Sequence, residues 1–317
     1  NKWNRLLEDY SRMTQYGDIL ESGTKGQLSD RFLFQARNLH IRDMIDGGLF
    51  PMIRQSKGET TLGKIGYTLT YKADGLRKLL IIGSSGIWLV FPPLEANLLL
   101  SWSQIEIDPS KIINVCIEGE LIPPEKRMDY SPDKPYNPKQ PYYLFLAFDI
   151  VYSSLFSSTM NKPESIRMNN LLVRHQAIGQ VINYLTNLSK EIANQAIIPT
   201  DRPRYHGPPD LYVHLKDFRP FDNRDQMIRL IAEMQTRVFK DDPTLIYRTD
   251  GYVITPIETP YLSYYLTTSQ KRPDKLYLNQ RQLSKVPDIC KLKFGTENTI
   301  DLAIVRIGDQ IRLYRSE

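Results

Sequence analysis

The stretch from residue 67 to residue 91 constrains the fold most, because three apolar, strand-like runs follow one another there with only short polar breaks. Its alternation and its β-branched residues predict two strands and then a third, with the turn "GSSG" before the last. The first break, "YKADGLR", sets Lys72, Asp74 and Arg77 between two buried runs. Either these charges mark an ordinary turn, or Lys72 is an amine held in a pocket to do chemistry.

The rest of the chain alternates helical and strand-like patterns, which predicts a mixed α+β fold with antiparallel sheets and intervening helices. Apolar residues at helical spacing predict helices over 1–13, 29–45, 163–188 and 224–239. The inner face of the last helix is expected to carry Ile228, Ile231, Met234 or Gln235, and Val238. Strands are predicted over 111–122, 142–152, 211–218, 250–257 and 289–295, and a hairpin turning at "GD" over 299–316. Six prolines between 123 and 141 predict a surface loop there.

The composition limits the class of protein. At 317 residues the chain has room for two domains, and no apolar run is long enough to span a bilayer. Two distant cysteines and four histidines without ligand spacing predict neither a disulfide framework nor a zinc site, and favour a reducing compartment. The net charge of +5 is compatible with a polyanionic partner. Because the chain begins with Asn1 and no targeting pattern follows, we expect it to be part of a longer polypeptide.

Lys-x-Asp-Gly alone is a weak signal, expected by chance in about one of twenty chains of this size. Its weight comes from further charged or aromatic motifs that follow it in order, each at the end of a predicted strand. These motifs are "EGELI" with Glu118 and Glu120, "FDIVY" with Phe148 and Asp149, "TDGYVI" with Asp250, and "CKLKFGTENTIDL" with Lys291, Lys293 and Asp301.

From about residue 60 to residue 304, this series resembles the covalent nucleotidyltransferases, the superfamily of mRNA capping enzymes and ATP-dependent polynucleotide ligases. "KADG" is similar to the first motif of that superfamily, "EGEL" to the third, "AFDIVY" to the variant third, "DGYVI" to the fourth, and "KLK" with "TIDL" to the fifth. The pairing of "KLK" with "TIDL" resembles capping guanylyltransferases more than ligases. "KADG" is more similar to the first motif of enzymes from large DNA viruses and cytoplasmic linear plasmids than to the Thr form that is commoner in cellular capping enzymes.

The chemistry of Lys72 can be argued from its surroundings. A nucleophilic amine must be neutral, a state that burial and positive neighbours such as Arg77, Lys291 and Lys293 favour. The neutral amine can attack the α-phosphate of a nucleoside triphosphate and release pyrophosphate. Lys291 and Lys293, two apart on a strand, point to one side and can both face the phosphates.

The carboxylates suit a divalent metal, Mg²⁺ or Mn²⁺, which would neutralise phosphate oxygens. Glu120 and Asp250 each adjoin a glycine, so ligand and backbone can approach closely. The resemblance implies that Glu120 also touches the ribose and that Asp250 is the better metal ligand. It also implies that Phe148 stacks on the purine base, while Asp74 orients Lys72 or its neighbours. Asp250, where ligases often carry Glu, again favours capping.

Each role has a structural alternative. Phe148 could be plain core, and Asp149 a turn or ion-pair residue. Lys291 and Lys293 could be a solvated pair on an edge strand. Glu118 is predicted to face away from Glu120 and to be structural, and Asp301 to be a strand-end contact.

The leading prediction is an mRNA guanylyltransferase that transfers GMP from GTP, through a lysyl adduct, to the 5'-diphosphate end of RNA. One alternative is a DNA or RNA ligase that uses ATP through the same adduct, and another is a degenerate, non-catalytic nucleic-acid-binding module. The predicted location is the cytoplasm, in a virus factory or a plasmid host, or the nucleus if the source is cellular.

The predicted domains are a helical segment or linker over 1–50, an ATP-grasp-like nucleotidyltransferase domain over 51–298, and the start of an oligonucleotide-binding fold over 299–317. The resemblance implies that this last domain carries a basic motif that orients pyrophosphate, and too few residues follow "TIDL" to complete it. We therefore expect the chain alone to bind nucleotide but to form the adduct poorly. Triphosphatase and methyltransferase domains are possible neighbours in the same polypeptide.

Overall fold

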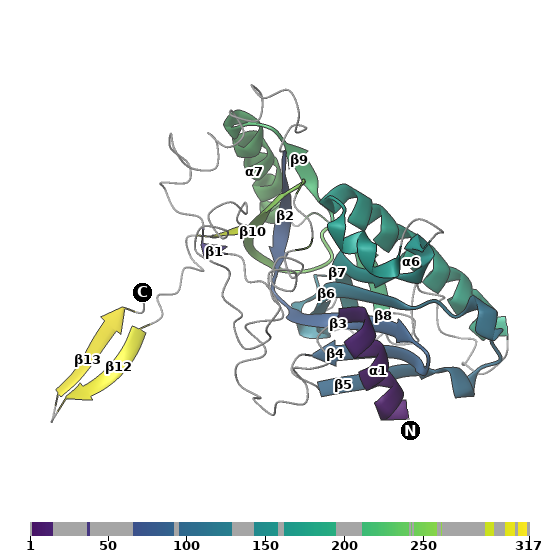
Figure 1. Ribbon diagram of the computed structural model, residues 1–317. Helices are drawn as coiled ribbons and strands as arrows, with labels where there is room; N and C mark the ends of the chain where they lie inside the picture. Colours follow the sequence, from purple (N-terminus) through teal and green to yellow (C-terminus); the bar gives the residue numbers. More distant parts are fainter. Residues whose placement is uncertain are drawn as a thin grey trace.

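The computed structural model is built mainly from two β-sheets, one of six strands and one of five. The described residues are 2–14, 66–91, 95–128, 143–157, 162–194, 211–240, 242, 244–258, 261 and 289–294, with the backbone alone at 14, 37–38, 168, 193–194, 302–307 and 310–315. Helices cover both faces of the larger sheet and strands pair mostly antiparallel (Figure 1). The predicted α+β class is confirmed. None of the helices described is long and apolar enough to cross a membrane.

The larger sheet has six strands in the order β5-β4-β3-β6-β7-β8, and all its pairs are antiparallel except β7 with β8. Its strands are β3 (Leu76–Gly83), β4 (Gly86–Phe91), β5 (Glu95–Ser101), β6 (Val115–Ile122), β7 (Tyr143–Ser153) and β8 (Leu211–Leu215). The predicted strands are found here, whereas β5 was missed. Its first four residues, "EANL", break the apolar alternation and are largely exposed, as is common in an edge strand.

The smaller sheet has five strands in the order β1-β11-β10-β2-β9, antiparallel except for β1 with β11. Its strands are β1 (Arg37–Asn38), β2 (Tyr67–Ala73), β9 (Arg219–Phe221), β10 (Thr249–Pro256) and β11 (Cys290–Lys293). A separate antiparallel hairpin joins β12 (Leu302–Ile307) to β13 (Gln310–Arg315), as predicted, and its expected turn lies outside the described residues.

Three α-helices are described, namely α1 (Lys2–Thr14), α6 (Leu171–Asn194) and α7 (Arg224–Phe239). Short 3-10 turns are η1 (Trp102–Gln104), η2 (Pro109–Lys111), η3 (Pro124–Lys126), η4 (Ser154–Phe156) and η5 (Pro163–Met168). The helix predicted from residue 163 begins at residue 171, because Asn170 caps it by accepting a hydrogen bond from the Val173 N–H.

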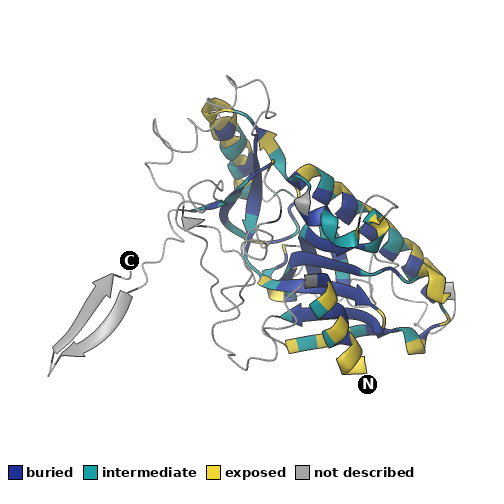
Figure 2. Ribbon diagram, viewed as in Figure 1, coloured by how far each residue is buried: buried dark blue, intermediate teal, exposed yellow. Residues whose placement is uncertain are grey.

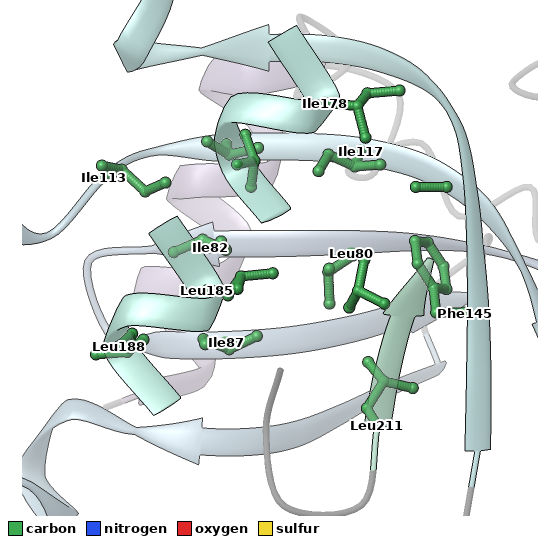
Figure 3. Packing of buried hydrophobic residues seen from close by; sticks show 14 of the residues in the cluster. Leu80, Ile82, Ile87, Ile113, Ile117, Phe145, Ile178, Leu185, Leu188 and Leu211 are labelled. Carbon is green, nitrogen blue, oxygen red and sulfur yellow. The ribbon is translucent and has the colours of Figure 1, made fainter. Parts of the chain in front are cut away.

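Apolar side chains on each face of the larger sheet pack against a different helix. On one face Leu80, Ile117 and Phe145 pack with Ile178 and Leu185 of α6 (Figure 3). On the opposite face, α1 is anchored by a second cluster of buried side chains, which includes Leu6, Tyr10, Met13, Ile81 and Trp88. Both faces of the sheet are consequently buried (Figure 2).

The smaller sheet shares a third core with α7. Tyr67, Leu69 and Tyr252 pack there with Met227 and Met234. Ile228, predicted to face inward, is instead 46% exposed, because α7 turns Met227 and Met234 toward the sheet. The strands β6 and β7 contribute Ile122, Leu144 and Leu146 to this same core, so the two sheets meet along it.

One predicted helix is wrong where it can be checked. Arg37 and Asn38, within the helix expected over 29–45, form β1 and pair with Cys290 and Lys291 of β11. Pairing with an open strand edge satisfies the backbone there, and this outweighs the local helical periodicity. The rest of that predicted helix lies outside the described residues.

Candidate nucleotide site at the junction of the two sheets

The segment "YKADGLR" carries the chain from one sheet to the other. Lys72 lies near the end of β2 in the smaller sheet, and Arg77 lies at the start of β3 in the larger one. Only Asp74 and Gly75 separate the two strands. The charged break in the sequence is therefore neither a hairpin nor a loop but a crossing between sheets.

Three lysines share one face of the smaller sheet. Gly251 of β10 lies opposite Lys72 of β2 on one side and opposite Lys293 of β11 on the other. Lys291, two residues before Lys293, points to the same side by strand alternation. Gly251 has φ of 155°, and a Cβ there would lie 2.0 Å from the Leu292 carbonyl oxygen, so only glycine fits between the two lysines.

Asp250 binds the Lys72 amine directly. The register between β2 and β10 shifts between Thr249 and Gly251, which leaves Asp250 as the extra residue of a β-bulge. Its carboxylate accepts hydrogen bonds from Lys72 Nζ at 2.8 Å and 2.7 Å. Sequence alternation alone does not predict this contact, because the bulge re-aims the aspartate side chain.

Glu120 approaches the same crossing from β6. Its Oε1 accepts a hydrogen bond of 3.2 Å from the Gly75 N–H. A Cβ on Gly75 would lie 2.7 Å from Glu120 Cγ and 2.7 Å from the Leu121 carbonyl oxygen. Gly75 therefore allows Glu120 to pack directly against the chain where it leaves β2.

Lys216 is a member of this site that the sequence reasoning missed. It directly follows β8, its side chain is 5% exposed, and its Nζ lies 3.8 Å from Glu120 Oε2. Burial lowers the pKa of Lys216; Glu120 opposes this effect, while Lys72 and Arg77 add to it. The one available signal was a lysine at the end of the apolar strand "LYVHL".

Two positively charged side chains lie over the aromatic ring of Phe148. Glu118 and Gly119 pair with Asp149 and Ala147, so Phe148 is the extra residue of a second β-bulge. The Arg77 guanidinium lies 5.6 Å from the ring centroid, and Lys216 Nζ lies 5.5 Å from it. Such positions are within cation–π range. Phe148 is therefore part of the charged site and is only partly buried.

Glu118 faces the same side as Glu120, contrary to the prediction. Residues two apart on a strand point the same way, and the Glu118 carboxylate accepts hydrogen bonds from Arg77 Nε at 2.5 Å and from the Tyr261 hydroxyl at 2.8 Å. Burial lowers the pKa of Arg77, but the Glu118 charge and hydrogen bond raise it above its ordinary value. Glu118, 1% exposed, thus fixes Arg77 beside Phe148.

The other acidic residues have separate partners. Asp74 accepts a hydrogen bond of 2.8 Å from Lys126 Nζ, whereas the Lys72 amine is held by Asp250. Asp149 forms a two-point ion pair with Arg174 of α6, at 2.7 Å and 3.0 Å, which matches the ion-pair alternative. Asp301 lies outside the described residues.

Comparison with known proteins finds a distant relative in sequence. A probable mRNA-capping enzyme of Acanthamoeba polyphaga mimivirus is 24% identical to this chain over 213 residues. The match covers 62% of this chain and 17% of that relative, so the chain spans about one sixth of its length. No protein-family model matches the chain.

Two solved structures overlap with the chain only loosely. The structure named "Pmar-Lig_Pre" has a TM-score of 0.36 at 12% identity, covering 73% of this chain and 43% of its own. The ligase domain of LigD from M. tuberculosis has a TM-score of 0.32 at 11% identity, covering 64% and 52%. Overlaps this weak carry no conclusion about function.

The class that the motifs and the sequence relative support is the covalent nucleotidyltransferases, the superfamily of capping enzymes and polynucleotide ligases. Within that class, the relative in sequence is a probable capping enzyme.

Proposed function

We propose that this chain transfers GMP from GTP to Lys72, and from Lys72 to the 5'-diphosphate end of an RNA. The observation that carries the proposal is the cluster at the sheet junction, in which Lys72, bound to Asp250, shares a face with Lys291 and Lys293. The name of the mimivirus relative supports capping as the overall process.

The first half-reaction uses the Lys72 amine. Its nitrogen forms a bond to the α-phosphorus of GTP while the bond to the β-phosphate oxygen breaks and pyrophosphate leaves. The amine must first give up a proton, and the Asp250 carboxylate, 2.7 Å from Nζ, is within reach to receive it. The covalent intermediate divides one difficult transfer into two easier ones.

Lys291 and Lys293 are suited to the triphosphate. Both lie on the face of the smaller sheet that carries Lys72, and Gly251, paired with Lys72 and with Lys293, adds no side chain between them. Fixed ammonium groups beside a phosphoryl group in transfer stabilise the charge that develops in the transition state. Their proposed role is therefore to bind and polarise phosphates.

A divalent metal fits this donor set only together with the nucleotide. Within the described residues, no three or more His, Cys, Asp or Glu side chains come together as a complete metal cage. Mg²⁺ commonly uses one or two carboxylates with water and substrate phosphates. We assign Asp250 as the main ligand and Glu120 as a second. A metal bound there would neutralise phosphate charge.

Lys216 favours GTP over ATP. Its ammonium lies beside Phe148, the ring proposed to stack on the base. Guanine presents two acceptors, O6 and N7, on the edge where adenine presents one acceptor and an amino donor. An ammonium donates hydrogen bonds and accepts none, so it complements guanine better.

The test is covalent labelling by α-labelled GTP or ATP in the presence of Mg²⁺. Because the chain alone is expected to form the adduct poorly, we expect slow labelling by GTP. The label should be retained in the control Lys240→Ala, which alters an exposed lysine at the end of α7, and lost in Lys72→Ala. Label from ATP alone would support the ligase alternative instead. Binding of RNA with no label from either nucleotide, even after long incubation, would support the degenerate binding module.

A further inference from the structure

A basic rim borders the proposed site where three segments of the chain meet. The Asp74 N–H donates to the Arg248 carbonyl at 3.2 Å, and the Arg248 N–H donates to the Lys126 carbonyl at 3.0 Å. These residues follow β2, precede β10 and follow β6, respectively. Backbone hydrogen bonds thus hold Arg248 beside Asp74, directly after the end of β2, and hold Lys126 beside Arg248.

The rim lies close to the reacting groups in sequence and in space. Asp74 is two residues after Lys72, and Arg248 is two residues before Asp250, the partner of Lys72. The Lys126 carbonyl accepts its hydrogen bond from the Arg248 N–H, and Lys126 is the last residue of the turn η3. Lys126 and Arg248 therefore border the crossing between the two sheets that follows Lys72.

The side chains of the rim remain open to solvent. Lys126 Nζ donates to Asp74 Oδ1 at 2.8 Å, yet the two side chains are 36% and 49% exposed. Arg248 is exposed as well. An exposed pair of this kind contributes little to stability, so the fold does not depend on it. One contact to Asp74 leaves two of the three ammonium hydrogens of Lys126 available to another acceptor.

We propose that Lys126 and Arg248 bind the terminal phosphate of the acceptor RNA in the second half-reaction, an inference that rests on the proposed function. An oxygen of that phosphate forms a bond to the phosphorus of the lysyl-bound GMP. The bond from phosphorus to Lys72 Nζ breaks, and the nitrogen takes a proton from solvent. Cations at the rim hold the attacking phosphate, which carries two charges, while Lys291 and Lys293 hold the phosphate under attack.

This role predicts recognition of the 5' end itself. The test compares the affinity of the protein for two RNAs of one sequence, one ending in 5'-diphosphate and one in 5'-hydroxyl. We expect wild-type protein to bind the diphosphate form at least tenfold more tightly. In Lys126→Ala and Arg248→Ala that preference falls severalfold, and in the double variant it disappears.

The control is Lys111→Ala, because Lys111 of η2 forms a similarly exposed ion pair, at 3.2 Å, with Glu191 of α6. It should keep the full preference, and thermal melts should show all variants folded. Equal affinity of wild-type protein for both RNAs overturns the inference but not the proposed function, if GTP still labels Lys72. Loss of GTP labelling in Lys126→Ala to the same degree as loss of RNA preference also overturns it, since the cations would then serve the nucleotide. Wild-type protein that GTP never labels overturns the proposed function and this inference with it.

Discussion

Lys216→Met separates a role in nucleotide selection from a role in holding the fold. Methionine has a similar length and no charge. The Lys216 side chain is 5% exposed, and Oε2 of its carboxylate partner, Glu120, lies 3.8 Å from Nζ, beyond direct hydrogen-bond distance. Burial is the main reason why the pKa of Lys216 is lowered, so the charged form costs stability in the folded state. We therefore expect the free energy of unfolding of Lys216→Met to stay constant or to rise.

Nucleotide binding, unlike stability, should weaken in Lys216→Met. A hydrogen bond from a charged donor to guanine contributes about 1.5 to 3 kcal/mol, which is about 10- to 100-fold in affinity. The Kd for GTP should rise by that factor in Lys216→Met, whereas the Kd for ATP should change by less than about threefold. Titration calorimetry measures both constants, and urea unfolding measures stability.

The pH dependence gives a third measure of Lys216. In the unfolded chain the amine keeps its ordinary pKa of 10.5, above its lowered folded pKa. Between these two values the unfolded state binds more protons, so stability contributed by this site rises with pH. The difference between wild type and Lys216→Met should therefore shrink as the pH approaches 10.5. A Lys216→Met protein that loses about 2 kcal/mol or more of stability, and whose affinities for GTP and ATP fall equally, would show that Lys216 is a structural partner of Glu120 and does not select the nucleotide.

Three further changes test other parts of the site. Glu118→Gln removes the charge that pairs with Arg77 and should lower the free energy of unfolding by about 2 to 3 kcal/mol, less than for a fully buried pair because Arg77 is partly exposed. Urea unfolding at neutral pH measures this loss, and a loss below about 0.5 kcal/mol would contradict the prediction. Gly75→Ala places a Cβ 2.5 Å from Ile122 Cδ1 and 2.7 Å from the Leu121 carbonyl oxygen, so we expect the protein to lose about 1 to 3 kcal/mol of stability and to bind GTP more weakly. Unchanged stability and unchanged GTP affinity would contradict the close packing of Glu120 against residue 75. Burial lowers the pKa of His175 to about 4, so as the pH falls below 6.5 the unfolded chain takes up a proton at His175 before the folded protein does. Between pH 7 and pH 5 the free energy of unfolding of wild type should therefore fall by about 1 to 2 kcal/mol more than that of His175→Gln. If denaturant titrations give both proteins the same dependence of stability on pH, His175 does not cause the loss.

Strand alternation accounts for much of what the sequence could predict. It located most strands of both sheets and put Lys291 and Lys293 on one side of β11. It failed where the backbone departs from simple pairing. The two β-bulges re-aim Asp250 and Phe148, and no periodicity in the sequence marks either bulge.

Long-range pairing explains what was missed. Lys216 reaches the site because β8 pairs in parallel with β7, which lies about 60 residues earlier in the chain, and the Lys216 N–H donates to the Ala147 carbonyl at 2.9 Å. Arg37 and Asn38 form a strand because β11 offers them an open edge. Glu118 was assigned to the wrong face by an error of phase, since residues two apart share a face.

The central claim is that Lys72 is the residue that receives GMP. Its most direct test is mass spectrometry of peptides after incubation of the protein with GTP and Mg²⁺, alongside Lys72→Arg, which keeps a cation beside Asp250. The account predicts the mass of one GMP residue on the peptide that contains Lys72, and none in the variant. GMP on any other peptide, or equal modification of Lys72→Arg, would contradict it.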